Sequence, residues 1–170
     1  MERHIGVATV VLAAVIAVGC EQPLPSAPTL TRPLFAAATT MDIMATAGPL
    51  TITDSGKVWI SDSSILHIRN QTQTGPVTGD IVGAVTVTGR SDVEVATMTG
   101  TGSGKFTIAV TSGGTWEGSF EGRFDAGLFS GKLVAHGSGA LAGQLLRGSL
   151  SQTAPNRVYF LTGTILTTGS

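Results

Sequence analysis

Alternation of apolar and polar side chains is clearest within residues 113–150. From Thr115 to Phe124 the even positions hold aromatic residues or glycine, and the odd positions are all polar or charged. Successive side chains of a β-strand point to opposite faces, so this segment predicts a strand with one buried face. We therefore expect Trp116, Phe120 and Phe124 to point into the fold.

The same analysis predicts short strands along most of the chain after residue 49. Turn residues at 125–127 and near 137–139 separate three strands in the region just described. The other predicted strands are residues 50–53, 57–61, 64–73, 77–88, 93–110 (one strand or a pair) and 157–167. Gly75-Pro76 and residues 89–92 are predicted to interrupt the chain, because Gly, Pro and Asp favour turns. Residues 36–47 are predicted to be transitional, with a first irregular strand.

About eight strands with short turns and no crossover helix indicate the all-β class. A single antiparallel eight-stranded barrel is favoured over a sandwich. The reason is the glycines that recur inside the predicted strands, since bends at glycine help a small sheet to close. A transmembrane barrel would need two outward aromatic girdles. The chain has only two Trp, one Tyr and six Phe, which disfavours that alternative.

The N-terminus is predicted to carry a targeting signal. Residues 5–18 are apolar but shorter than the roughly 20 residues that a membrane-spanning helix needs. They end in Ala17-Val18-Gly19-Cys20, which contains the single cysteine of the chain. This segment resembles a bacterial lipoprotein signal with its lipobox, although Ala17 departs from the usual leucine. The alternatives are a secretory signal cleaved elsewhere and an uncleaved anchor.

The lipoprotein resemblance implies a domain organisation. Residues 1–19 would be the signal peptide, and Cys20 would be acylated and become the mature N-terminus. Residues 20–40 contain four prolines and are predicted to form an extended tether. Residues 41–170 would form the barrel. The domain would then lie on the extracytoplasmic side of a bacterial cell envelope, with the membrane as its partner through Cys20.

The run GGTWEGSFEGRFDAGLFSGKLVAHGSGALAGQLLRGSL resembles the core of the allene oxide cyclase-like barrels. In particular it is similar to small bacterial domains of that fold with no assigned function. The resemblance implies an eight-stranded barrel with a central cavity. In the plant cyclases this cavity binds an oxidised fatty acid and closes it into a ring. Their catalytic residues do not map onto this chain, so no catalytic residue is assigned.

Charged side chains mostly fall on the predicted outer faces. The carboxylates of Glu117 and Glu121 would be about 13 Å apart on one strand, too far for the paired acids of a glycosidase. His67 and His136 are also expected to point outward, without a third ligand for a metal. No cofactor is implied. With a net charge of −1 and 12% charged residues, the chain lacks the basic surface of a nucleic-acid-binding protein.

Arg147 is the exception, because leucines lie on both faces of its predicted strand. Leu145 shares the face of Arg147, whereas Leu146 and Leu150 share the other. If Arg147 points inward, it can orient a ligand carboxylate. Together with Trp116, Phe120 and Phe124 it forms the predicted cavity lining.

The function favoured by the sequence is that of a membrane-anchored lipoprotein whose barrel binds a small apolar ligand without catalysis. Two alternatives remain open. One is a cyclase or isomerase that acts in the cavity, and the other is a structural or partner-binding envelope lipoprotein with a solid barrel. The sequence leaves the oligomeric state open.

Overall fold

The computed structural model describes residues 38–167, which lie in the second of two units of the chain, residues 34–170. This part is all-β, with ten strands and one short 3-10 helix, η1 (Gly139–Leu141). No helix in residues 38–167 is long and apolar enough to cross a membrane. The strands are β1 (Thr39–Ala47), β2 (Thr51–Asp54), β3 (Lys57–Ile60), β4 (Ile65–Gly79), β5 (Gly83–Glu94), β6 (Thr99–Val110), β7 (Thr115–Asp125), β8 (Leu128–Ser138), β9 (Gln144–Ser151) and β10 (Tyr159–Thr167).

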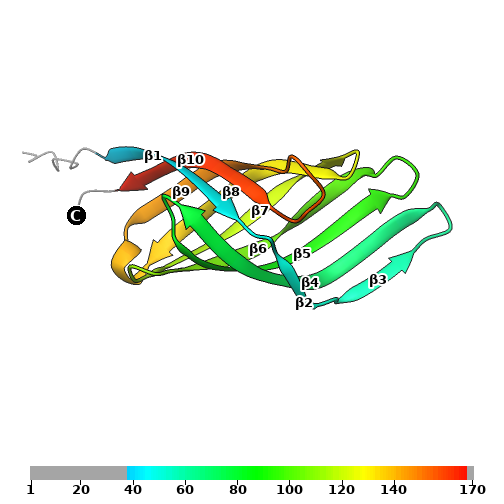
Figure 1. The fold of residues 1–170 in the computed structure, drawn as a ribbon, viewed down its shortest axis with the longest axis horizontal. Helices are drawn as coiled ribbons and strands as arrows, with labels where there is room; N and C mark the ends of the chain where they lie inside the picture. The colour runs from blue at the N-terminus through cyan, green and yellow to red at the C-terminus, as the bar shows by residue number, and fades with distance from the viewer. Residues whose placement is uncertain (1–37, 168–170) are drawn as a thin grey trace, which may run out of the picture. The chain divides into compact units, whose positions relative to one another are not determined.

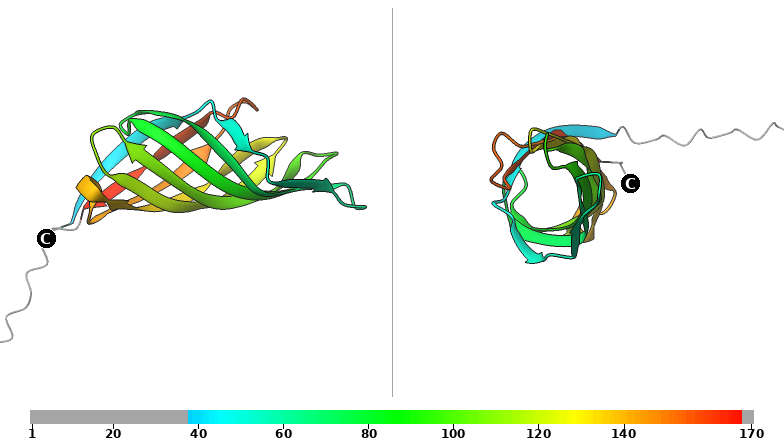
Figure 2. Two further views of the ribbon diagram at one scale, coloured as in Figure 1. Left: turned by 90° about the horizontal axis from the view of Figure 1, so that it is seen from below. Right: turned by 90° about the vertical axis from the view of Figure 1, so that its right-hand side faces the viewer.

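Eight of the strands form a closed antiparallel ring. Strands β4 to β10 pair in chain order, and β1 closes the ring by pairing with both β10 and β4. Strands β2 and β3 follow β1 along the same edge of β4 and extend beyond the ring (Figure 1). Figure 2 views the ring along its axis in the right-hand panel. The predicted all-β class and antiparallel sheet are therefore confirmed.

The first strand is more regular than the sequence indicates. All residues from Thr39 to Ala47 pair with β10, and Ala45 to Ala47 also pair with β4. The segment that the sequence leaves as transitional is thus the strand that closes the ring. Closure removes the exposed edges that β4 and β10 would otherwise present to other chains.

The predicted break at Gly75-Pro76 is wrong, because β4 continues through it to Gly79. Proline lacks the N–H that a central strand needs. Pro76 lies opposite the short connection between β1 and β2, where the neighbouring strand is interrupted. Its carbonyl accepts a hydrogen bond from Gly48 N at 2.8 Å, so its missing N–H faces this interruption and no strand partner is lost.

The predicted turn at residues 89–92 is also wrong, because β5 runs through it to Glu94. Each of these residues pairs with β6, and Gly89, Ser91 and Asp92 also pair with β4. Pairing on both sides overrides the local turn preference of glycine, serine and aspartate. The connections observed lie instead at residues 80–82 and 95–98.

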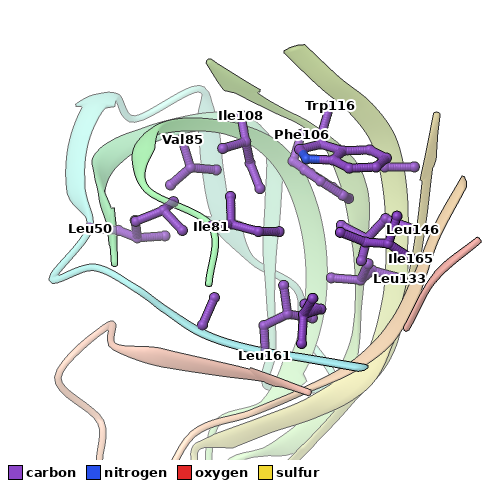
Figure 3. Close-up of a cluster of buried hydrophobic side chains, with 14 residues drawn as sticks. Leu50, Ile81, Val85, Phe106, Ile108, Trp116, Leu133, Leu146, Leu161 and Ile165 are labelled. Carbon is purple, nitrogen blue, oxygen red and sulfur yellow. The ribbon is translucent and has the colours of Figure 1, made fainter. Parts of the chain in front are cut away.

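Inside the ring, one half is filled by side chains. The buried residues come from the inward positions of many strands, and none of the buried residues in the described part is polar or charged. Trp116 and Leu146, at 1% and 0% exposure, lie among the most buried (Figure 3). Ile81 from the β4–β5 connection and Leu141 from η1 join this cluster. We call this half of the ring the packed end, and the opposite half, near residues 95–98, 126–127 and 152–158, the loop end.

Glycines inside the strands provide space for the aromatic rings. A Cβ atom at Gly102 would lie 2.9 Å from the ring of Phe124 and 3.1 Å from that of Phe129. At Gly122 it would lie 2.7 Å from the ring of Phe129. Gly102 pairs with Gly122, so the two form a side-chain-free floor beneath the phenylalanine rings. The absence of side chains at Gly102 and Gly122 therefore leaves room for the rings of Phe124 and Phe129.

Candidate ligand-binding site

A cavity of about 340 Å³ lies inside the ring and extends from the packed cluster to the loop end. Most of its wall is aliphatic or aromatic. The aliphatic part includes inward side chains from five ring strands: Val77, Val85, Val87, Ile108, Leu133 and Leu161. Gly127, Pro155 and Arg157 border it at the loop end, where it is partly open. Small-molecule sites typically occupy about 300–1,000 Å³ and are mostly apolar, so the cavity has the size and lining of a site for a small apolar molecule.

An aromatic cluster forms one side of the cavity. Phe129 lies at its centre, with ring centroids 5.9 Å from Phe120, 5.2 Å from Phe124 and 6.2 Å from Tyr159. All three contacts are edge-to-face, the arrangement that aromatic quadrupoles favour. The cluster joins β7, β8 and β10. It therefore forms an aromatic wall of the cavity between the packed cluster and the loop end.

A few polar side chains also face the cavity. Gln71 and Gln73 come from β4, Gln152 and Arg157 from the β9–β10 loop, and Tyr159 from β10. Gln152 is held by the fold, because its Oε1 accepts a hydrogen bond from Phe129 N at 3.0 Å. Burial raises the pKa of the Tyr159 phenol, and the nearby charge of Arg157 opposes this shift. Tyr159 is thus neutral at physiological pH.

Gln73 carries an unsatisfied polar atom. Its Nε2 donates a hydrogen bond to Gln71 Oε1 at 2.7 Å, but its Oε1 is buried and has no hydrogen-bond partner. Within residues 38–167 it is the only buried side-chain polar atom in this state. A buried acceptor without a partner costs about 1–3 kcal/mol of stability. Unpaired groups of this kind are rare enough in folded proteins to require a specific reason.

The sequence did not indicate Gln71 and Gln73 because a bulge reverses the alternation of β4. Ile68 faces inward, so simple alternation places Gln71 and Gln73 outside. The pairing of β4 with β5 shifts between Ile68 and Gln71, and Asn70 has a positive φ of 57°. Asparagine tolerates this left-handed conformation better than most residues. The extra residue turns both glutamines into the ring.

The predicted lining residues have different positions in the structure. Phe120 and Phe124 lie on the cavity wall. Trp116 faces inward, as its alternation predicts, but is packed in the buried cluster and does not line the cavity. Cys20 lies outside the described residues.

The inward orientation considered for Arg147 is wrong. Leu146 is completely buried, which turns the two neighbouring side chains of β9 outward, and Arg147 is exposed on the outer face. The sequence was ambiguous there because Leu145, on the same side as Arg147, is half-buried although it lies outside the ring.

Phe129 and Tyr159 are cavity residues that the sequence analysis did not single out. The signal was present in both cases. Phe129 shares its face with Leu133, and Tyr159 shares its face with Leu161 and Ile165. Extending the alternation from β7 to β8 and β10 would have placed both aromatic rings inside.

The outer face of β3, β4 and β5 carries a separate cluster formed by Trp59, His67, Arg69 and Asp92. His67 stacks on Trp59 at 4.9 Å between ring centroids, and Arg69 lies over the Trp59 ring at 5.4 Å. Asp92 Oδ1 lies 2.5 Å from His67 Nδ1 and 2.7 Å from Arg69 Nη2. Arg69 Nη1 also donates hydrogen bonds to the carbonyls of Ile68 and Ser91. These side-chain contacts join β3 and β5 to β4 and stabilise the part of this three-stranded segment that extends beyond the ring.

The contacts of Asp92 in this cluster predict that the folded state loses stability as the pH falls into the acidic range. The hydrogen bond from Arg69 is the main cause that lowers the pKa of Asp92 below its ordinary value of 3.8, with a smaller contribution from His67. The ionised carboxylate therefore stabilises the folded state above about pH 3.8, and this contribution is lost as the pH falls through the lower folded-state pKa. We expect Arg69→Met to raise the pKa of Asp92, measured by NMR titration of its side-chain carboxyl group.

Arg147→Met is the matched control, since Arg147 is exposed on β9 and does not border the surface hollow that Asp92 lines. An unchanged pKa of Asp92 in Arg69→Met, or an equal rise in Arg147→Met, would contradict the role given to Arg69.

Glu117, Glu121 and Arg123 are exposed on the outer face of β7, as predicted, and His136 is exposed on β8. Residues 38–167 contain no group of three His, Cys, Asp or Glu side chains arranged to hold a metal ion. No family model matches the chain, and no curated protein matches it at a significant level. The candidate function therefore rests on the cavity.

Proposed function

We propose that this chain is a membrane-anchored bacterial lipoprotein whose ring of eight strands is a β-barrel of the allene oxide cyclase-like type, and that it binds a small apolar ligand inside the ring. The observation that carries the binding proposal is the cavity of about 340 Å³ with a largely aliphatic and aromatic wall. A barrel of eight strands can be filled completely by its own side chains. Here the buried cluster fills the packed end, whereas nearer the loop end the aromatic residues line the cavity wall without filling the interior.

Binding would be driven by removing apolar surface from water. Each Å² of apolar surface buried contributes about 25 cal/mol. The aromatic cluster around Phe129 offers edges and faces for a planar or aliphatic ligand. The charged groups that border the cavity, Arg90 and Arg157, are exposed. The body of the ligand would therefore lie among uncharged side chains.

The lipoprotein part of the proposal is supported by the lone Cys20 at the end of a short apolar segment. Two or more acyl chains anchor a protein stably, because each buried methylene contributes about 0.8 kcal/mol. We expect mass spectrometry of the membrane fraction to find an acylated Cys20 at the mature N-terminus. We expect Cys20→Ala to yield protein that is unprocessed or released from the membrane. A mature N-terminus at any other residue would contradict this part of the proposal.

Filling the cavity tests the binding part. At about ten times its Kd, a ligand that binds only the folded state stabilises it by about 1.4 kcal/mol, which raises the Tm by about 5 °C. We expect 2-methylnaphthalene, a compact apolar probe, to produce such a shift in the wild type. Val87→Phe places a larger side chain in the cavity and is expected to abolish the shift.

Thr86→Phe is the matched control, because Thr86 precedes Val87 on β5 but is exposed on the outer face. It should fold and respond to the probe like the wild type. If the probe shifts the Tm of Val87→Phe as much as that of the wild type, binding does not occur in this cavity.

A further inference from the structure

The Gln71–Gln73 pair is a polar feature of the cavity wall whose hydrogen bonding the fold does not complete. The two residues are two positions apart on β4 and therefore share its inward face. Gln73 lies between Ile52 of β2 and Val87 of β5 in the sheet, and both neighbours are apolar. The amide of Gln73 thus has no protein group to pair with except Gln71. Gln152 differs, since its amide is engaged by the backbone of Phe129.

The arrangement of the two amides decides which partner is missing. In the arrangement described, Gln73 donates to Gln71 and leaves its own Oε1 as an unpaired acceptor. If both amides exchange their oxygen and nitrogen, Gln71 donates to Gln73, and Gln73 Nε2 becomes an unpaired donor. Exchange of one amide alone would bring two acceptors or two donors together. In each of the two favourable arrangements, therefore, Gln73 has one unpaired polar atom.

We propose that the cavity selects an apolar ligand that carries one hydroxyl group, and that this hydroxyl pairs with Gln73. This inference rests on the proposed function, because it assumes that the cavity holds a ligand. A hydroxyl group both donates and accepts, so it satisfies Gln73 in either arrangement of the amides. A ketone or a carboxylate only accepts hydrogen bonds, so it can pair with Gln73 in only one of the two arrangements. A hydrocarbon fits neither and leaves the amide unpaired.

A carboxylate is further disfavoured by its charge. Placing an ionised group among uncharged walls requires a partner of opposite charge. The two arginines that border the cavity are exposed, and Arg90 Nε donates a hydrogen bond to Ser103 Oγ. The buried part of the wall therefore fits a neutral alcohol better than an acid.

Two probes of nearly equal shape test the proposal: 2-naphthol and 2-methylnaphthalene, which has a methyl group in place of the hydroxyl. Their dissociation constants are measured by equilibrium dialysis with the full wild-type chain and with Gln73→Met. Methionine keeps the length of the side chain and removes the amide. One net hydrogen bond corresponds to about a fivefold change in affinity. We expect the preference for 2-naphthol over 2-methylnaphthalene to fall about five- to tenfold in Gln73→Met.

Gln144→Met is the matched control, because this substitution makes the same chemical change at a residue of β9 that does not line the cavity. It should leave the preference unchanged. The Tm of each variant without probe establishes folding, and we expect that of Gln73→Met to be equal to or above the wild-type value, since an unpaired buried atom has been removed. Gln71→Met provides a second test: it leaves both polar atoms of the Gln73 amide without a protein partner, so the preference for 2-naphthol should be retained or increased.

The outcomes separate the two proposals. If the wild type binds neither probe, the proposed function fails. If it binds both probes and the preference is the same in wild type and Gln73→Met, or falls in Gln71→Met as far as in Gln73→Met, the apolar cavity stands and the inference that the hydroxyl pairs with Gln73 is wrong.

Discussion

Trp116→Ala should lower the free energy of unfolding by about 3–5 kcal/mol, the range typical of large aromatic residues truncated in a core. Trp116 is 1% exposed and packs among the apolar residues that fill the packed end. Its removal would leave a cavity that the surrounding ring of paired strands cannot close by a small shift. Denaturant unfolding, with the midpoint and slope fitted separately, measures the loss.

Glu117→Ala is the control for this experiment. Glu117 follows Trp116 on β7 but is exposed on the outer face. Its replacement is expected to change the free energy of unfolding by no more than about 0.5 kcal/mol. Comparable losses in the two variants would mean that the inward and outward faces of β7 have been assigned wrongly.

Gly118→Ala should be the second strongly destabilising change, although it adds only one methyl group. The added Cβ would lie 2.1 Å from the carbonyl oxygen of Val134 and 2.6 Å from the Cβ of Ala135. Both contacts are with β8, so the methyl group would force β7 and β8 apart where they pair. Overpacking in a core costs about 1–3 kcal/mol, and disrupted pairing adds to it. We expect a loss of at least about 2 kcal/mol by the same unfolding measurement.

Gly89→Ala provides a matched comparison within the ring. Gly89 is also an inward glycine of a central strand, but a Cβ there would lie 3.4 Å from the Ser103 carbonyl oxygen and 3.5 Å from the Phe120 ring. These are ordinary contact distances. Alanine at this position should therefore be tolerated within about 1 kcal/mol. If Gly118→Ala were equally mild, close packing of β7 against β8 would not explain the glycine.

The alternation of β7 was sufficient to predict the fold class and the inward aromatic residues. Trp116, Phe120 and Phe124 face inward because the opposite face of this strand contains only polar side chains. The same reasoning applied to β8 and β10 reaches Phe129 and Tyr159. The antiparallel arrangement followed from short connections without crossover helices. These features depend on local pattern, which the sequence contains directly.

The errors occurred where pairing with distant strands decides the structure. Pro76 remains in a strand because its missing N–H faces the gap between β1 and β2, about thirty residues earlier in the chain. Residues 89–92 remain extended because β4 and β6 pair with them from both sides. The bulge at Asn70 turns Gln71 and Gln73 inward, and single-strand alternation gives the opposite result. The polar part of the cavity therefore depended on register, which one sequence does not specify.

The most direct test of the central claim is a calorimetric titration of the wild-type chain with 2-methylnaphthalene at several temperatures. Binding of an apolar molecule within the ring predicts one site per chain and a negative heat-capacity change, the robust signature of apolar surface removed from water. We expect this signal to be absent in Val87→Phe and retained in Thr86→Phe. No binding by the wild type, or an equal titration with Val87→Phe, would contradict the account of the ring as a ligand-binding cavity.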